Sequence, residues 1–377
     1  MPSLASVRRR RAAVLAAAAA AFAGGAALGA GGDEQPGPAA PRAVAPAPDA
    51  TPTPTPTPEP VDELSLREQV GKLVVLRFEG TEVPTYVRRV LRRGWAAGAI
   101  LFKVNVQSPG QLRRMTRVLR RSARFTPIIC TDQEGGDIRN VAWAPPAAGQ
   151  ARQAAGRDAR AAARELRRLG INVTLAPVAD VPTHPGTALA GRAFSSDPAA
   201  AARATKAAVA GWRAGGVAAT AKHFPGLGGA TTNTDFGSAT IGDGAPTDAD
   251  LAPFEAAIEA RVPLIMSAHA RYPRLDARRI ASQSPAILKD LLRDQLGYRG
   301  VVITDSIEAK AVKPTGELEA VAVRSIRAGN DIVLTTGQGS WIRTYRALLA
   351  EARRSPSFRK QVRESAARVL ALQESLR

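Results

Sequence analysis

Four short segments place acidic, basic or imidazole side chains directly after runs of apolar residues. A carboxylate at the end of a buried strand is costly unless it is hydrogen-bonded or functional, so each segment is a candidate for chemistry or for a structural pairing. Paired glycines indicate close approach of the backbone to a ligand, and a Pro-Gly loop can lie over a pocket. The segments are Asp132-Gln133-Glu134-Gly135-Gly136, Lys222-His223-Phe224-Pro225-Gly226, Met266-Ser267-Ala268-His269 and Val301-Val302-Ile303-Thr304-Asp305.

These segments belong to a regular alternation of short apolar runs and amphipathic stretches. Eight apolar runs predict strands: Leu73–Phe78, Ala99–Lys103, Pro127–Asp132, Val173–Asp180, Val217–His223, Leu264–His269, Val301–Asp305 and Asp331–Thr335. Stretches with apolar spacing of three to four predict helices, among them Gln111–Arg121, Ala151–Leu169, Ala199–Ala214, Pro285–Leu296 and Leu318–Ala328. The alternation predicts an α/β fold, and eight such units imply a closed (β/α)8 barrel of the TIM type.

An open doubly wound sheet would show the same alternation of strands and helices. The count of eight strands and the positions of the polar residues favour the barrel. Asp132, Asp180, Lys222-His223, His269 and Asp305 all fall at the carboxyl ends of predicted strands, where barrel enzymes place their chemistry. We therefore expect a single barrel domain with its site at that end.

The chain divides into three parts by composition. In residues 1–30 a cluster of arginines precedes an uncharged, alanine-rich stretch, which is typical of a signal peptide or an N-terminal anchor. Residues 31–61 are rich in Pro and Thr and predict a disordered linker, and residues 62–377 carry the barrel pattern. We expect an exported protein that is extracellular, in the cell wall or anchored on the outer face of the membrane, and monomeric.

The composition argues against several other classes of protein. A formal net charge of +19 predicts solvated, arginine-rich helix faces, with attraction to an anionic wall or membrane surface as the alternative. No nucleic-acid partner is expected, because no zinc-finger, RNP-type or helix-turn-helix pattern accompanies the charge. No metal or cofactor is implied, since His184, His223 and His269 lie on separate segments and Cys130, expected in a buried strand, is the single cysteine. No Gly-x-Ser-x-Gly elbow suggests a serine hydrolase.

The order of the motifs resembles that of family-3 glycoside hydrolases, in particular single-domain bacterial β-N-acetylglucosaminidases that act on cell-wall fragments. The resemblance extends from about Ser65 to the end of the chain. It rests on Ile100-Leu101-Phe102 with Asn105, Asp132–Gly136, Leu175-Ala176-Pro177-Val178-Ala179-Asp180, Gly191-Arg192-Ala193-Phe194-Ser195-Ser196-Asp197-Pro198, Lys222–Gly226, Met266–His269, Gly300–Asp305 and Ala328-Gly329.

The resemblance implies a retaining mechanism in which Asp305 attacks the anomeric carbon and forms a covalent glycosyl-enzyme. A second group must then protonate the leaving oxygen and later activate water. The resemblance also implies that the sugar, an N-acetylglucosamine-containing glycan, is held by pocket side chains. We expect these to be Asp132, Arg192, Lys222, His223 and His269, together with Arg139.

The chain departs from the family pattern where the acid/base should lie. The family carries an Asp-x-His dyad on the loop after Lys-His-Phe-Pro-Gly, and these positions are Asn233 and Asp235 here, so the catalytic histidine is absent. The family arginine eight residues after Asp132 is replaced by Asn140, with Arg139 one position earlier. Leu227 replaces a further histidine of the motif.

Three functions are compatible with this departure. In the first, Asp235 replaces the histidine as acid/base, with its pKa raised by repulsion from Asp305, and the protein hydrolyses β-N-acetylhexosaminides of peptidoglycan origin with weakened activity. In the second, the barrel keeps its sugar pocket without efficient turnover and acts as a sugar-binding or regulatory wall protein. In the third, the substrate or reaction has changed, to another hexosaminide or to a phosphorolysis-type transfer.

Overall fold

The structure is a computed structural model that describes residues 59–189, 191–242 and 246–377. The proposed signal or anchor and nearly all of the linker lie outside the described residues. The barrel unit begins at Glu59, slightly before the expected boundary at residue 62. A 3-10 turn over Pro60–Glu63 (η1) starts it, and Val61 in this turn is buried. No helix in the described part of the chain is both long and apolar enough to cross a membrane.

Eight parallel strands form one sheet whose order follows the chain around a ring, β6-β3-β2-β1-β12-β11-β8-β7. A bridge between Val173 and Ala218 joins the two ends of this order, so the sheet closes into a barrel. The predicted (β/α)8 fold is confirmed, and the open-sheet alternative is wrong. The strands are β1 Val74–Arg77, β2 Gly98–Ile100, β3 Ile128–Thr131, β6 Val173–Thr174, β7 Thr220–Phe224, β8 Leu264–Ser267, β11 Val301–Ser306 and β12 Ile332–Leu334.

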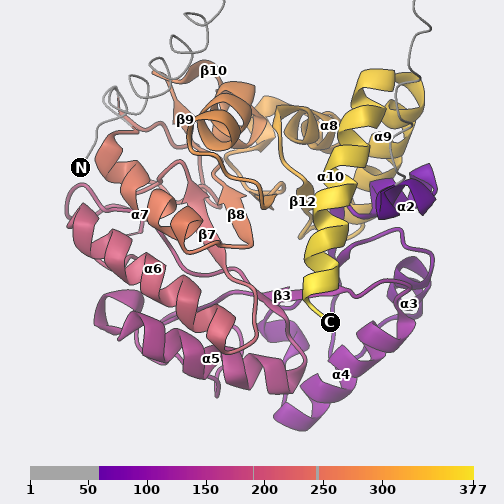
Figure 1. Cartoon of the computed structure of the whole chain (residues 1–377), viewed down its shortest axis with the longest axis horizontal. Helices are drawn as coiled ribbons and strands as arrows, with labels where there is room; N and C mark the ends of the chain where they lie inside the picture. Colours follow the sequence, from indigo (N-terminus) through magenta and orange to yellow (C-terminus); the bar gives the residue numbers. More distant parts are fainter. Residues whose placement is uncertain (1–58, 190, 243–245) are drawn as a thin grey trace, which may run out of the picture. The chain divides into compact units, whose positions relative to one another are not determined.

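Helices surround the strands, as Figure 1 shows for α5, α6 and α7 along one side of the ring. The helices are α2 Leu66–Gly71, α3 Thr85–Arg92, α4 Pro109–Ser122, α5 Ala155–Leu169, α6 Pro198–Ala214, α7 Asp248–Glu259, the π-helix η5 Ala286–Gln295, α8 Leu318–Ala328, α9 Ser340–Arg354 and α10 Pro356–Ser375.

All five predicted helices are present, with one difference at the start of α5. The helix begins at Ala155 instead of Ala151, because side chains of the preceding residues form hydrogen bonds to loop segments at the carboxyl ends of the strands. The Gln150 amide exchanges two hydrogen bonds with the Val178 backbone, and the Gln153 amide donates to the Glu134 carbonyl. These tertiary contacts prevent residues 150–153 from joining the helix.

The predicted strand Val173–Asp180 keeps regular ladder pairing only over its first two residues. Pro177 has no amide hydrogen to donate and interrupts the ladder, and beyond Thr174 the pairing with β7 is an isolated bridge between Val178 and Lys222. Individual backbone hydrogen bonds, such as that from the Thr220 amide to the Ala176 carbonyl, still join this segment to β7. Two antiparallel hairpins were not predicted. They are β4 Gln133–Gly135 with β5 Ile138–Arg139, and β9 Arg271–Tyr272 with β10 Asp276–Ile280.

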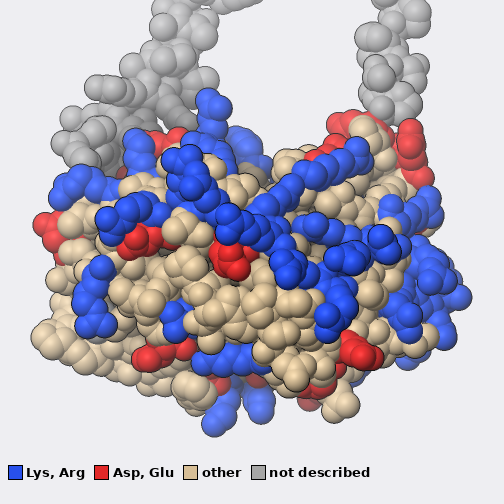
Figure 2. Space-filling view, turned by 90° about the horizontal axis from the view of Figure 1, so that it is seen from below, with Lys and Arg blue, Asp and Glu red and all other residues tan. Residues whose placement is uncertain are grey.

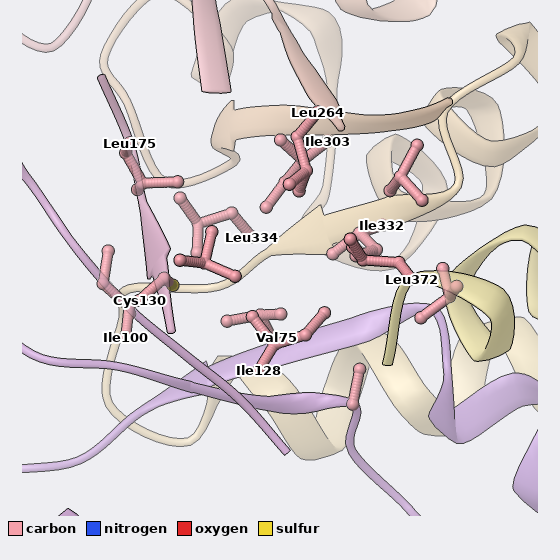
Figure 3. Packing of buried hydrophobic residues seen from close by; sticks show 14 of the residues in the cluster. Val75, Ile100, Ile128, Cys130, Leu175, Leu264, Ile303, Ile332, Leu334 and Leu372 are labelled. Carbon is pink, nitrogen blue, oxygen red and sulfur yellow. The ribbon is translucent and has the colours of Figure 1, made fainter. Parts of the chain in front are cut away.

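The barrel interior is filled by apolar side chains from the strands (Figure 3). Cys130 is buried among them on β3, as predicted. Helix α10 contributes Leu372, which lies beside Ile332 near the start of β12, so this helix covers the amino ends of the strands. With that end closed, the carboxyl ends are left for a site.

The basic charge lies on exposed helix surfaces, as the sequence predicted. On α4 the side chains of Arg113, Arg114, Arg117 and Arg121 are all exposed. Figure 2, which views the molecule of Figure 1 from below, shows basic side chains spread over this face with few acidic ones among them.

Candidate active site

A cavity of about 650 Å³ opens at the carboxyl ends of the strands. This volume is that of a small-ligand pocket. The cavity brings together every site residue predicted from the sequence except His269: Asp132, Arg139, Arg192, Lys222, His223, Asn233, Asp235 and Asp305. Within the described chain no group of three or more His, Cys, Asp or Glu side chains could hold a metal ion.

Asp305 lies in the cavity near the end of β11, with 19% of its side chain exposed. Its Oδ1 accepts a hydrogen bond of 2.7 Å from the Ser306 amide, and its Oδ2 lies 4.0 Å from Nε2 of His223. Burial alone would raise the pKa of Asp305, but electrostatic interactions with His223, His269 and Lys222 outweigh it and hold the pKa below its ordinary value. The carboxylate is therefore in the ionised form that a nucleophile needs.

His223 is oriented by Asp180, which is fully buried on the neighbouring segment. An Asp180 oxygen lies 2.7 Å from Nδ1 of His223, and the same carboxylate accepts from the backbone amides of His223 and Leu227. A carboxylate can only accept, so Nδ1 carries the proton and Nε2 faces Asp305. Sequence reasoning placed Asp180 at a strand end but gave it no role in the site.

Four other charged groups of the cavity form one ion-pair network, in which Lys222 and Glu134 are buried and Asp132 and Arg192 are partly exposed. Nζ of Lys222 lies 2.6 Å from Asp132 and 2.6 Å from Glu134, and Arg192 makes two hydrogen bonds of 2.8 and 2.7 Å to Glu134. Burial opposes each charge. For Lys222 the two carboxylates outweigh burial and raise the pKa above its ordinary value, and for Glu134 the cations Lys222 and Arg192 lower the pKa to about 2. The ion pairs therefore hold all four side chains in place without a ligand.

Glu134 is the central residue of this network and was missed as a site residue by sequence reasoning. Its side chain is 2% exposed and contacts both Lys222 and Arg192. The Asp-x-Glu spacing was the available indication, because a second carboxylate two residues after Asp132 points to the same side of an extended segment.

Asp235 lies at the rim of the cavity on the segment between β7 and α7, here called the Asp235 loop (residues 229–242). The Asn233 side chain accepts a 2.9 Å hydrogen bond from the Asp235 amide, which is the geometry of an Asx turn. The loop is also tied to the segment after β11, because the amides of Lys310 and Ala311 donate to the carbonyls of Asp235 and Thr234.

The environment of Asp235 differs from that of Asp305. Partial burial and, second, the negative charge of Asp305 raise the pKa of Asp235 above its ordinary value, although His223, Arg192 and His269 act in the opposite direction. The pKa values of the two carboxyl groups are therefore shifted in opposite directions within one cavity, that of Asp305 downward and that of Asp235 upward.

His269 does not line this cavity and lies behind Asp305. Its Nε2 is 2.9 Å from the Ser306 carbonyl oxygen, and its Nδ1 is 2.8 Å from the Ser282 hydroxyl. A carbonyl can only accept, so Nε2 carries the proton and Nδ1 accepts from Ser282. Burial lowers the pKa of His269 despite the nearby charge of Asp305, which favours the neutral ring. This geometry suits holding the end of β11 better than contacting a sugar.

Arg139 lines the cavity from the β4–β5 hairpin, where it lies opposite Gln133. Neither a hydrogen bond nor an ion pair joins its guanidinium to another residue of the described chain. Arg139 is therefore a cavity cation that is available to a ligand, whereas the Arg192 guanidinium is already engaged by Glu134.

Comparison with known proteins agrees with this geometry. The sequence model of the "Glycosyl hydrolase family 3 N terminal domain" matches residues 65–372. The chain belongs to glycosyl hydrolase family 3. The family resemblance inferred from the motifs is thereby confirmed over nearly the range expected.

Three similar proteins describe the relationship further. A "Beta-hexosaminidase" of Stenotrophomonas maltophilia is 35% identical over 280 residues, covering 70% of this chain and 82% of that protein. An "Uncharacterized secreted glycosyl hydrolase" of Arthroderma benhamiae is 33% identical over 350 residues, covering 84% of this chain and 96% of that protein. A solved family-3 β-N-acetylglucosaminidase from Paenibacillus sp. is 31% identical with a TM-score of 0.78. This match covers 83% of the chain and 63% of the longer Paenibacillus chain.

Proposed function

We propose that the protein is an exported, retaining β-N-acetylhexosaminidase that acts on N-acetylglucosamine-containing glycans of cell-wall origin. The observation that carries the proposal is the pair of carboxyl groups in one cavity, an ionised Asp305 and an Asp235 whose raised pKa favours the protonated form. A retaining glycosidase needs a nucleophile and an acid in these two states. Two relatives named for hexosaminide hydrolysis support the substrate class, and the relative named as secreted supports export.

In the first step an Asp305 oxygen forms a bond to the anomeric carbon while the bond from that carbon to the leaving oxygen breaks. Asp235 gives its proton to the leaving oxygen and becomes a carboxylate. In the second step this carboxylate takes a proton from water, whose oxygen attacks the anomeric carbon and releases Asp305. Two displacements at the same carbon retain its configuration.

The remaining residues bind and orient the sugar. Lys222, Asp132 and Arg192 bind the sugar hydroxyl groups, and their ion pairs fix them in position before the sugar binds. Arg139 adds a cation that has no partner in the described chain. His269 positions Asp305 through the Ser306 carbonyl, in place of the direct sugar contact expected from the sequence.

We expect hydrolysis to be slow for natural leaving groups. A positioned acid/base contributes roughly 10²- to 10⁴-fold to the rate, and an exposed carboxyl on a loop replaces the family's histidine. The second candidate function, a sugar-binding wall protein without efficient turnover, is favoured by the same departure at Asn233 and Asp235.

Hydrolysis of an aryl N-acetyl-β-glucosaminide tests the proposal, because an activated aryl leaving group needs little protonation. We expect slow, measurable release of the aryl alcohol that is abolished in Asp305→Ala and retained in Asp290→Ala, a control at an exposed position of η5. Absence of turnover at high enzyme concentration, together with calorimetric binding of N-acetylglucosamine, would instead establish the sugar-binding protein.

A further inference from the structure

A second cavity, of about 260 Å³, lies next to the Asp235 loop and has a different character from the active site. Residues 238–240 of the loop form one wall, the β9–β10 hairpin labelled in Figure 1 forms another, and the segment after β11 forms a third. Four arginines line it, and no Asp or Glu belongs to the described residues of its lining. We call it the arginine cavity; its cations are Arg271, Arg278, Arg279 and Arg324.

Most of the positive charge in the arginine cavity has no carboxylate partner among residues 59–189, 191–242 and 246–377. Arg271 donates to the Ala277 carbonyl, and Arg324 donates to the Gln283 side chain and the Thr315 carbonyl, which are all neutral acceptors. The side chain of Arg278 has no hydrogen bond or ion pair within the described chain. Arg279 alone contacts a carboxylate, at 3.5 Å from Asp276. Guanidinium groups gathered around a hollow with a single carboxylate contact in the described chain favour an oxyanion that accepts from several of them.

Neutral donors complete the lining. The hydroxyl-bearing residues Ser238, Thr240 and Thr315 belong to the lining, although the Thr315 hydroxyl already donates to the Val312 carbonyl. Hydroxyls and guanidinium groups together match a group with several acceptor oxygens around one centre. A volume of about 260 Å³ admits a phosphate group with part of a small molecule attached, and excludes a polymer.

Two hydrogen bonds connect the arginine cavity to the active site. His269 lines the arginine cavity, and its Nε2 contacts the carbonyl of Ser306, which lines the active site. Ala311 also lines the arginine cavity, and its amide donates to the carbonyl of Thr234 on the active-site wall.

Arg271 provides the most direct connection to the loop itself. Its amide donates to the Ala239 carbonyl, and its carbonyl accepts from the Ile241 amide, so the loop pairs with the start of the β9–β10 hairpin. An anion held by Arg271 would therefore hold the loop that carries Asp235. Asp305 does not belong to the lining, so the anion would not be positioned to attack the sugar.

We propose that the arginine cavity binds a small, multiply charged oxyanion, such as phosphate or the phosphate group of a small metabolite, and that binding restrains the Asp235 loop. The oxyanion brings the counter-charge that Arg271, Arg278 and Arg324 lack and completes the wall on which the loop rests. Any effect of the bound oxyanion on turnover rests on the proposed function, whereas binding of the oxyanion and restraint of the loop do not.

Calorimetric titration of the full chain with inorganic phosphate, at ionic strength held constant with chloride, tests the binding. We expect saturable binding with one phosphate per chain, weakened roughly tenfold or more in Arg271→Gln/Arg278→Gln. The matched control is Arg113→Gln/Arg117→Gln, which removes the same charge from the exposed face of α4 and should leave the affinity unchanged. Equal weakening in both double variants, or no saturable binding, would overturn the site.

The same experiment with N-acetylglucosamine 6-phosphate identifies the source of the phosphate group. Tighter binding than inorganic phosphate, lost in Arg271→Gln/Arg278→Gln, supports a phosphorylated metabolite, and equal affinity supports the free ion. Hydrogen exchange reads out the loop without any catalytic activity. We expect phosphate to slow exchange of the Ile241 and Ala311 amides several-fold. Binding without any slowing would overturn the restraint of the loop.

Discussion

The two ends of the barrel each bury a lysine, and the two lysines have opposite properties. Lys222, 3% exposed on β7 at the carboxyl ends, contacts the carboxylates of Asp132 and Glu134, and its pKa lies above the ordinary value. Lys72, 1% exposed just before β1 at the amino ends, contacts the Gln373 side chain and lies over the Phe125 ring. Burial lowers the pKa of Lys72 to about 7, with Glu68 and Glu374 offsetting part of the effect.

The difference shows that burial alone does not identify a functional lysine. At the carboxyl ends, carboxylates outweigh the desolvation of Lys222 and leave a fixed positive charge that a ligand can use. At the amino ends, the Gln373 amide oxygen and the Phe125 ring compensate only part of the desolvation of Lys72, so its charged form is poorly stabilised. Compensation by carboxylates therefore distinguishes the lysine of the proposed active site from the lysine that is buried at the opposite end of the barrel.

The largest effect is expected for Lys222→Met. The substitution leaves the buried carboxylate of Glu134 and the partly buried carboxylate of Asp132 with less counter-charge, which should lower the free energy of unfolding by about 3 kcal/mol. Loss of a positioned charged donor should also lower kcat/KM by about 1000-fold. Urea unfolding and kinetics with the aryl glycoside measure both. Lys289→Met, at an exposed position of η5, is the control. If Lys222→Met lost no more stability than this control, the carboxylates would not depend on Lys222 for their counter-charge.

A smaller effect, confined to activity, is expected for Asp235→Asn. Removing the proton donor should lower kcat about 100-fold for a disaccharide and much less for an aryl glycoside, while the exposed position leaves stability unchanged. Restoring the family dyad with Asn233→Asp/Asp235→His should raise turnover of the disaccharide. Unchanged disaccharide hydrolysis in Asp235→Asn would show that another group protonates the leaving oxygen.

The pH dependence of kcat/KM tests the difference between the pKa values of the two carboxyl groups, Asp305 and Asp235. The proposed mechanism needs Asp305 ionised and Asp235 protonated. The pKa of Asp305 lies below its ordinary value of 3.8 and that of Asp235 lies above it, so activity should rise through the first and fall through the second. The profile should be bell-shaped, and Asp235→Asn should lose the alkaline limb. An alkaline limb that persists in this variant would assign that limb to another group.

Sequence reasoning succeeded at the strand ends because parallel strands bring their carboxyl ends together whatever lies between them. It therefore placed Asp132, Lys222, His223 and Asp305 correctly in one cavity. The eight strands were predictable for the same reason, since buried parallel strands are continuous apolar runs.

Contacts between distant segments were not predictable. The role of Glu134 depends on Arg192, 58 residues away, and that of Asp180 depends on His223, 43 residues away. His269 was expected among the pocket side chains, but it lies outside the lining of the cavity and donates a hydrogen bond from Nε2 to the Ser306 carbonyl. Both hairpins and the start of α5 were missed because short polar segments have no periodicity that distinguishes a turn from a helix.

The smallest effect, and the only stabilising one, is expected for Lys72→Met. Met has a similar volume and no charge to desolvate, so the free energy of unfolding should rise by about 1 kcal/mol at pH 6. The pKa of Lys72 is about 7 in the folded chain against 10.5 when exposed, so the penalty of burying the charge is fully present below pH 7. It disappears as the pH rises to 10.5.

The advantage of Lys72→Met over the wild type should therefore shrink between pH 7 and pH 10.5. Urea unfolding at pH 6 and pH 9.5 measures this difference, with Lys289→Met as the control whose effect does not change with pH. Activity should be unchanged, because Lys72 lies at the opposite end of the barrel from Asp305. A variant that is less stable at pH 6 would show that Gln373 and Phe125 stabilise the Lys72 charge as well as Asp132 and Glu134 stabilise that of Lys222. The two ends would then differ in position and not in the way they hold a buried charge.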